Sequence, residues 1–225
     1  MKFFLIIGGT GVMGTSAIRA IREHFDQNSV IIANWYGKES PGFQIEGADY
    51  TIFGDINDLS CREQIKSFNN GKFDYMFYAT ALGDVGIPIK DATQEQIDRS
   101  NKLSFNPIPQ LENELDISTI VAYSTFYTIR HQLSTYGAMG HSKENIEKWT
   151  VASDGSSKHA CIRAGLFESP SSRGIKLLLR KTSKNLDNLK DPLLRSYFEN
   201  TPSSEGIKKF EEGIFKEEEE AYGDC

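Results

Sequence analysis

The chain has 225 residues, 39% of them hydrophobic and 25% charged, which suits one globular domain with a substantial core. Lys and Arg number 25 against 31 Asp and Glu, and the net charge of −6 argues against nucleic acid or an anionic membrane as partner. No apolar stretch has the length of a membrane span or the flanks of a signal peptide. The three cysteines are far apart and form neither a disulfide framework nor a metal motif. We therefore expect a cytoplasmic protein without a metal ion.

Short apolar runs alternate with helical patterns along most of the chain. The apolar runs predict six strands, at residues 2–7, 30–33, 50–53, 73–79, 117–124 and 159–163. Helical spacing predicts helices after residue 11, near residue 58, over 94–103 and over 136–152. Strands that alternate with helices and are apolar on both faces form a parallel sheet with helices on both faces. The sequence thus predicts an α/β fold, doubly wound and of Rossmann type, with about six strands.

The pattern changes near residue 166. We interpret residues 1–166 as the Rossmann core of a single domain that covers residues 1–225, and residues 167–225 as a helical substrate or lid region with an acidic tail. The acidic run at residues 217–220 is typical of a solvated helix end, and we assign it no function.

A glycine-rich turn follows the first predicted strand and opens the first helix. Glycines there let the backbone approach a pyrophosphate, whose charge is stabilised by the N–H groups at the helix N-terminus. A tight strand-to-helix connection is the alternative explanation, but the strand and helix context favours a dinucleotide site. The turn residues expected to contact the dinucleotide are Gly8, Thr10, Gly11, Val12, Met13 and Gly14.

The ends of the second and third strands bear on the choice of dinucleotide. Asn34 stands where a carboxylate would bind the ribose hydroxyls and repel a 2′-phosphate, and Lys38 follows it closely. This pair tilts the prediction toward NADP(H) over NAD(H). Asp55 and Ile56 follow the third strand where adenine is expected to lie, although a capping aspartate in a turn explains Asp55 equally well.

Further motifs make residues 1–170 resemble a short-chain dehydrogenase/reductase. The segment Ala79-Thr80-Ala81 follows the fourth strand and is similar to the family's N-A-G motif, and Asn101, another residue of the resemblance, lies in the helix predicted over residues 94–103. The helix after the fifth strand contains Tyr136, Met139 and Lys143, which match the Y-x-x-M-x-x-x-K signature of the divergent branch, the enoyl-acyl carrier protein reductases. The family's common Tyr-x-x-x-Lys motif is missing, because residue 139 is a methionine.

The spacing of the signature is consistent with a shared role for its two polar residues. Seven residues at about 100° each return to within about 20° of the starting direction, so Tyr136 and Lys143 are expected on one helix face. The resemblance implies that Tyr136 is the proton donor and that Lys143 is its electrostatic partner and a ribose ligand. A surface tyrosine and a solvated lysine are the alternatives, and Met139 is expected to be a packing residue.

The resemblance also implies roles for residues after the fifth and sixth strands. Ser124 and Thr125 would supply hydroxyl groups near the nicotinamide. Phe126 or Tyr127 would contact the substrate together with Tyr136, and the alternative is that Phe126 and Tyr127 pack at the strand end. The cofactor residues implied after the sixth strand, by likeness to the family's P-G-x-x-x-T motif, are Gly165, Leu166 and Ser169.

The function implied is an NAD(P)H-dependent reductase that transfers hydride to an enoyl or carbonyl substrate, either a small molecule or an acyl group on a carrier. The tyrosine spacing favours enoyl reduction, but the sequence does not exclude keto reduction. A catalytically weak dinucleotide-sensing or scaffolding protein of the same fold is the alternative. Self-association of the chain is left open.

Overall fold

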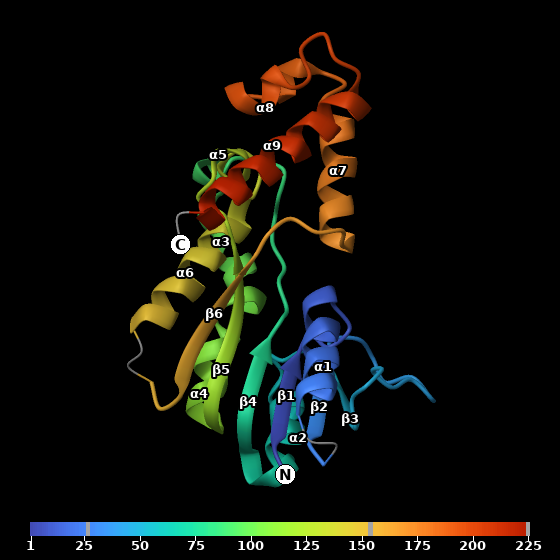
Figure 1. Ribbon diagram of the computed structural model, residues 1–225, viewed down its shortest axis with the longest axis vertical. Coiled ribbons are helices and arrows are strands. Elements are labelled where there is room, and N and C mark those ends of the chain that lie inside the picture. The colour runs from blue at the N-terminus through green and yellow to red at the C-terminus, as the bar shows by residue number, and fades with distance from the viewer. Residues whose placement is uncertain (26–27, 153–154, 224–225) are drawn as a thin grey trace. The chain divides into compact units, whose positions relative to one another are not determined.

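The computed structural model describes residues 1–25, 28–152 and 155–223 and confirms the alternation of strands and helices (Figure 1). The strands are β1 (Phe3–Ile7), β2 (Val30–Trp35), β3 (Tyr50–Phe53), β4 (Lys72–Tyr78), β5 (Asp116–Thr125) and β6 (Lys158–Ala164). The helices are α1 (Val12–His24), α2 (Leu59–Ser67), α3 (Gln94–Ser104), α4 (Pro107–Glu114), α5 (Arg130–Leu133), α6 (Gly137–Ala152), α7 (Pro170–Thr182), α8 (Pro192–Ser196) and α9 (Ser203–Gly223). Three short 3₁₀ turns complete the list: Phe68–Gly71, Ile89–Asp91 and Leu186–Asn188.

The strands form one six-stranded sheet in the order β3-β2-β1-β4-β5-β6. Strand β1 pairs in parallel with β2 and β4, β2 pairs in parallel with β3, and β4 with β5. The chain thus begins in the middle of the sheet, and the order reverses between β1 and β4. In open α/β sheets ligands bind beyond the carboxyl ends of the strands at such a switch point. The end of β1 is therefore the first place to look for a site.

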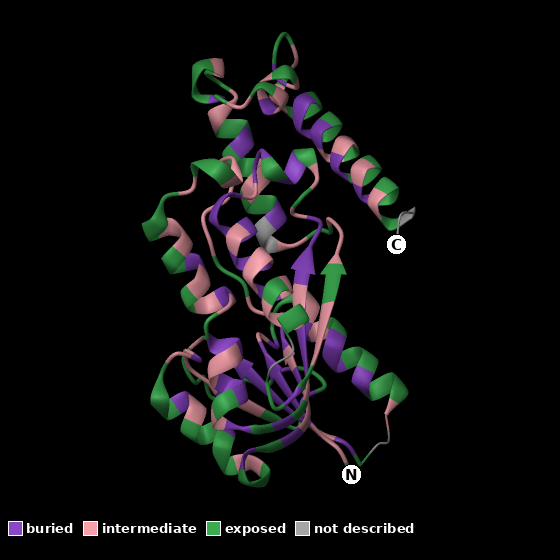
Figure 2. Cartoon of the chain, turned by 90° about the vertical axis from the view of Figure 1, so that its left-hand side faces the viewer, coloured by how far each residue is buried: buried purple, intermediate pink, exposed green. Residues whose placement is uncertain are grey.

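The strands near the centre of the sheet are largely buried because they are apolar on both faces (Figure 2). In β1, Phe4 and Ile6 pack with Ile18 and Ile21 of α1. The alternating residues Leu5 and Ile7 belong to the opposite core, which also contains residues of α2, α4 and α6. Helices therefore cover both faces of the sheet, as a doubly wound fold requires.

The chain forms two compact units. The first comprises Met1–Leu82, Lys102–Tyr123 and Asn145–Ile162, and it contains the two cores on either side of the sheet. The second comprises Gly83–Asn101, Ser124–Glu144 and Arg163–Cys225. It has a separate core that α7, α8 and α9 build around Leu179, Leu194 and Phe210. Among the described residues, no helix combines the length and the apolar composition needed to cross a bilayer.

Candidate functional site

The turn after β1 folds tightly onto the start of α1. Gly8 has φ +85°, and its carbonyl oxygen accepts a hydrogen bond from Gly11 N at 3.0 Å. A Cβ on Gly14 would lie 2.9 Å from Gly9 Cα and closer still to Gly8 O, so only glycine fits there. Gly11 is the N-cap of α1 and has no side chain that could accept a hydrogen bond from the first N–H groups of the helix. Those N–H groups are therefore available to an anion.

The segment after β4 borders the same turn. A Cβ on Gly8 would lie 3.0 Å from Thr80 N and 3.2 Å from Ala79 O, so these backbone atoms lie directly against Gly8. Ala79 N donates to Ile7 O at 2.8 Å and extends the pairing of β4 with β1 by one residue. Thr10, Val12 and Ala81 are exposed and Met13 is partly exposed. The structure thus brings together the two cofactor segments that the sequence predicts at the middle of the sheet.

Asn34 does not face the open end of the sheet. Its side chain is buried, and Nδ2 donates to Gly54 O at 3.1 Å and lies 3.4 Å from the sulfur of Cys61 in α2. In the alternation of β2, Asn34 follows Ile32 toward the core that includes α2, so its amide joins β2 to the end of β3. The expectation that Asn34 stands beside a ribose is therefore at odds with its placement. Lys38 is exposed.

Asp55 and Ile56 occupy a turn between β3 and α2. Asp55 Oδ1 accepts from both the backbone N and Nδ2 of Asn57, each at 2.9 Å, which is the turn geometry given above as the alternative for Asp55. The Ile56 side chain is buried in the core, and its carbonyl oxygen accepts from Arg62 at 3.1 Å.

Tyr136 precedes α6 and does not lie within it, contrary to the helix predicted over residues 136–152. Tyr136 forms a parallel bridge with Ile87, and the next residue, Gly137, has φ +49°. A Cβ on Gly137 would collide with Asp84 O, so this left-handed residue separates Tyr136 from the helix. The argument that Tyr136 and Lys143 share a helix face by their seven-residue spacing is therefore wrong. Burial raises the pKa of Tyr136 well above its usual value of 10.

Helix α6 packs its signature residues inward. Lys143 is 6% exposed, which excludes the alternative of a solvated lysine. Met139 is 8% exposed and lies against Gly83, as expected of a packing residue. Between them Ser142 is fully buried, and its hydroxyl donates to Asn101 Oδ1 of α3 at 2.8 Å. The Asn101 of the resemblance is thus joined to the helix that carries Lys143.

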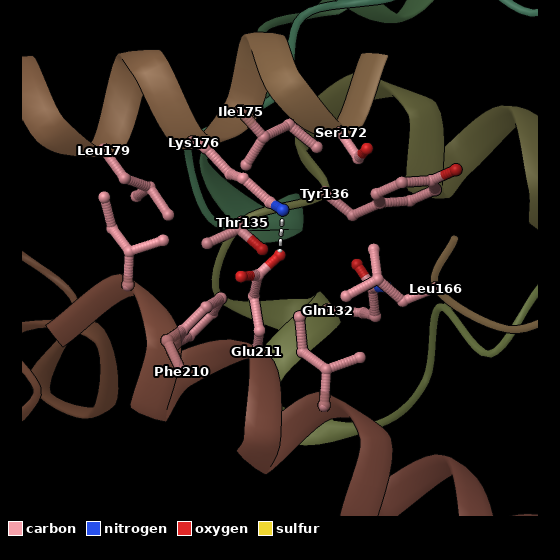
Figure 3. Close-up of a pocket in the computed structure, with 12 residues that line it drawn as sticks. Gln132, Thr135, Tyr136, Leu166, Ser172, Ile175, Lys176, Leu179, Phe210 and Glu211 are labelled. Carbon is pink, nitrogen blue, oxygen red and sulfur yellow. Dashed lines mark ion pairs between the residues drawn. The ribbon is translucent and has the colours of Figure 1, made fainter. Parts of the chain in front are cut away.

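A cavity of about 50 Å³ adjoins Tyr136 in the second unit (Figure 3). Its apolar wall comes from Leu166, Ile175, Leu179, Ile207, Phe210 and Ile214, and its polar wall from Gln132, Thr135, Tyr136 and Ser172. Lys176 and Glu211 complete the lining and form an ion pair at 2.7 Å. Figure 3 shows the ring of Tyr136 at the edge of the cavity, with its hydroxyl pointing away from that ion pair. The space would hold roughly three to five water-sized groups.

The end of β5 holds the predicted hydroxyl and aromatic residues. Ser124 is 3% exposed, and Thr125 Oγ1 donates to Ala164 O at 2.8 Å. Phe126 is buried and packs edge-on against Tyr222 of α9, with ring centroids 4.6 Å apart. Tyr127 is partly exposed. Packing at the strand end, the alternative given for the aromatic pair, describes Phe126.

The segment after β6 is engaged by the chain's own side chains. The backbone N of Leu166 donates to both carboxylate oxygens of Glu218, at 2.9 and 3.0 Å. A Cβ on Gly165 would lie 2.8 Å from Glu218 Oε2. Ser169 is the N-cap of α7 and forms a reciprocal capping box with Ser172. These three predicted cofactor residues therefore have structural partners in the protein as it stands.

Sequence reasoning did not find Glu217 and Glu218, and their partners correct the expectation of a solvated acidic end. Glu217 pairs with Arg130 at 2.9 Å and with His131 Nδ1 at 2.9 Å, while Glu218 is 4% exposed. Burial alone would raise the pKa of Glu217, but the hydrogen bonds from His131 and Arg130 lower it below the usual 4.5. Helical spacing from the apolar residues Phe210 and Ile214 places positions 217 and 218 on the inward face of α9, and this signal could have found them. Among the described residues, no group of His, Cys, Asp and Glu side chains could hold a metal ion.

No family model matches the chain, and no curated protein matches it in sequence. Solved structures do match. A short-chain dehydrogenase/reductase from Saccharomyces cerevisiae has 16% identity and a TM-score of 0.60, and the match covers 89% of this chain and 82% of that one. A short-chain dehydrogenase family protein from Francisella tularensis has 19% identity and a TM-score of 0.60, with 83% and 77% covered. A short-chain dehydrogenase from Shigella flexneri, complexed with NADP, has 15% identity and a TM-score of 0.59, with 77% and 81% covered. This chain thus has the fold of short-chain dehydrogenase/reductase structures.

Proposed function

We propose that the protein is an NAD(P)H-dependent reductase of the short-chain dehydrogenase/reductase type. The observation that carries the proposal is the glycine turn between β1 and α1, at the point where the strand order reverses in a fold shared with such enzymes. The neighbouring solved structures include one in complex with NADP, which supports a nicotinamide dinucleotide as the cofactor.

The residues of the turn fit a dinucleotide. The absence of side chains at Gly8 and Gly14 lets the turn fold closely against Ala79 and Thr80 and against itself, and Gly11 provides no side-chain cap for the N–H groups at the start of α1. The pyrophosphate would accept hydrogen bonds from these N–H groups, aided by the positive end of the helix dipole. When bound, the nicotinamide would supply the hydride for reduction. Ala79–Ala81 would border the dinucleotide, because this segment lies against Gly8.

We further propose that the dinucleotide is NADP(H). The exposed ammonium of Lys38 follows β2 and is the candidate partner for a 2′-phosphate. Asn34 contributes only by the lack of a carboxylate at that position, because its amide is committed to Gly54 O. The preference therefore rests on Lys38.

Tyr136 is proposed as the proton donor. Its desolvated phenol has a pKa well above 10, so it keeps its proton at neutral pH, as a donor in the reductive direction must. Its hydroxyl would donate to the substrate oxygen that gains negative charge as hydride arrives. The buried ammonium of Lys143 is proposed as its electrostatic partner and ribose ligand, and Ser124 and Thr125 as hydroxyls near the reacting group.

The cavity beside Tyr136 supports an apolar substrate group. Six of its twelve lining residues are aliphatic or aromatic hydrocarbons, and Leu166 and Tyr136 both contribute to its wall. A carbonyl or enoyl compound with a short apolar chain, free or attached to a carrier, suits this lining. Phe126 and Tyr127 stay proposed as neighbours of that substrate.

A second candidate, a dinucleotide-sensing or scaffolding protein without turnover, is favoured by one observation. Helix α6 begins at Gly137, so Tyr136 lies outside the helix that carries Lys143, and the spacing that marks the catalytic pair is not realised on one continuous helix. Such a protein would bind dinucleotide without oxidising it.

One pair of variants tests the proposal. With a substrate panel of enals, enoyl thioesters and ketones, Tyr136→Phe is expected to lower kcat by about 10²–10⁴-fold while leaving the Kd for NADPH unchanged, because general acid assistance is worth that much. Tyr127→Phe is the comparison and should lose much less activity, because Tyr127 is proposed to contact the substrate and not to donate the proton. Dinucleotide binding with no NADPH oxidation across the whole panel would favour the sensor. Full activity of Tyr136→Phe would overturn the assignment of the proton donor.

A further inference from the structure

Glu218 of α9 has an unusual place for a carboxylate. It is 4% exposed, and both of its oxygens lie within 3.0 Å of the backbone N of Leu166. Gly165 makes this approach feasible, because a Cβ there would lie 2.8 Å from Glu218 Oε2. The carboxylate thus lies directly on the backbone that follows β6.

Stability does not account for this contact. A buried carboxylate loses its hydration, and it is normally compensated by a cation or by several donors. Of the described residues, no Lys, Arg or His forms an ion pair with Glu218, and the N–H of Leu166 is its one hydrogen-bond donor. The burial is accordingly unfavourable for the charged form and raises the pKa of this group.

The neighbouring residue already holds α9 in place. Glu217 pairs with Arg130 and His131 of α5, and Phe210 of the same helix packs against the ring of His131 at 5.1 Å. Glu218 can therefore leave Leu166 without the loss of the contacts that attach α9 to α5.

We infer that Glu218 is a built-in competitor for the Leu166 N–H, and that dinucleotide binding requires its departure. The inference rests on the proposed function and on the cofactor role that the resemblance implies for Gly165 and Leu166, with the Leu166 N–H taken as the donor to the nicotinamide carboxamide. The carboxamide oxygen of a nicotinamide is an acceptor of the same kind as a carboxylate oxygen, and one N–H serves one well-aligned acceptor at a time. Glu218 thus lowers the affinity of the free protein for its cofactor.

Two variants and one control test the competition. Glu218→Ala removes the acceptor, Glu218→Gln keeps an uncharged and weaker one, and Glu219→Ala makes the same change at the exposed neighbouring position of α9. The Kd for NADPH, followed by its fluorescence, is expected to fall about 10-fold in Glu218→Ala, less in Glu218→Gln and not at all in Glu219→Ala, because a hydrogen bond to a charged group is worth about that factor. If Glu218→Ala does not fold, Glu218→Gln carries the test.

Amide hydrogen exchange gives a readout that does not depend on any cofactor. The Leu166 amide should exchange at least about 10-fold faster in Glu218→Ala than in the wild type or in Glu219→Ala. Unchanged protection would overturn the inference, and so would equal or weaker NADPH binding by Glu218→Ala. If none of the proteins binds a dinucleotide, the proposed function is wrong and the competition fails with it. If all bind equally, the proposed function stands and only the competition is wrong.

Discussion

The substitution Gly14→Ser tests how tightly the turn after β1 is built. The added Cβ would lie 2.9 Å from Gly9 Cα and nearer to Gly8 O, about 1 Å short of van der Waals contact. Relief requires Gly8 O to move, which disturbs its 3.0 Å hydrogen bond from Gly11 N. Overpacking of this kind costs about 1–3 kcal/mol, a lost hydrogen bond about 1 kcal/mol, and the better helix propensity of serine returns about 0.5 kcal/mol.

The net loss expected for Gly14→Ser is about 2 kcal/mol, which lowers the Tm by about 4–8 °C in a chain of this size. Gly11→Ser is the matched control. Gly11 has φ −75° and ψ 163° at the N-cap, and a Cβ there would lie 3.4 Å from Gly8 O, so serine fits and is a favoured cap. Circular dichroism melts of both variants measure the difference, and NADPH titration should show weaker binding by Gly14→Ser. Indistinguishable melting of the two variants would refute the steric reasoning.

Three further sets of variants have definite expected outcomes. Phe210→Ala should lower the free energy of unfolding, measured in urea, by about 3–5 kcal/mol, because Phe210 is 2% exposed. Phe215→Ala is the control and should lower it little, because Phe215 is 47% exposed on the same helix. Equal losses would contradict the assignment of the second core. Asn34→Asp should lower the free energy of unfolding by about 1–3 kcal/mol, because a carboxylate would face the carbonyl oxygen of Gly54. Lys38→Ala should weaken NADPH binding and leave NADH binding unchanged. If Asn34→Asp shifts the preference toward NADH without a loss of stability, the buried placement of Asn34 is contradicted. The pKa of Glu217 is lower in the folded state than in the unfolded state, so ionised Glu217 stabilises the protein above about pH 4.5, and this contribution is lost as pH falls through the folded-state pKa. The difference in unfolding free energy between the wild type and Glu217→Gln should therefore shrink on acidification. A constant difference would argue against ionised Glu217 as the partner of His131.

The sheet and the glycine turn could be predicted because their signals are local. Continuous apolar runs mark strands that are buried on both faces, and the spacing of Gly8, Gly11 and Gly14 marks a close strand-to-helix connection. The same is not true of Asn34. Its position at the end of a strand is visible in the sequence, but the face it occupies follows from strand alternation and from the donors and acceptors of β3 and α2.

The parts that failed depend on single backbone angles or on distant contacts. Gly137 is tolerated within a helical pattern, and only the structure shows that it has a positive φ, that a Cβ there would collide with Asp84 O, and that the helix begins after Tyr136. The burial of Glu217 and Glu218 depends on residues some 50 to 90 positions away along the chain. The single-domain division, the site roles and the cofactor preference stay predictions.

The order of synthesis has a consequence for the second unit. The first unit is complete at Ile162, whereas the second draws on Gly83–Asn101 and Ser124–Glu144 and still needs α7 and α9. At about 5–20 residues per second, the ribosome takes on the order of 3–12 s to add the roughly 60 residues from Arg163 to the end of α9. Until Tyr197, Phe210 and Glu217 have been added during that interval, His131 lacks the partners that bury it in the finished protein. The nascent chain therefore carries a complete first unit while the core of the second unit is still unfinished.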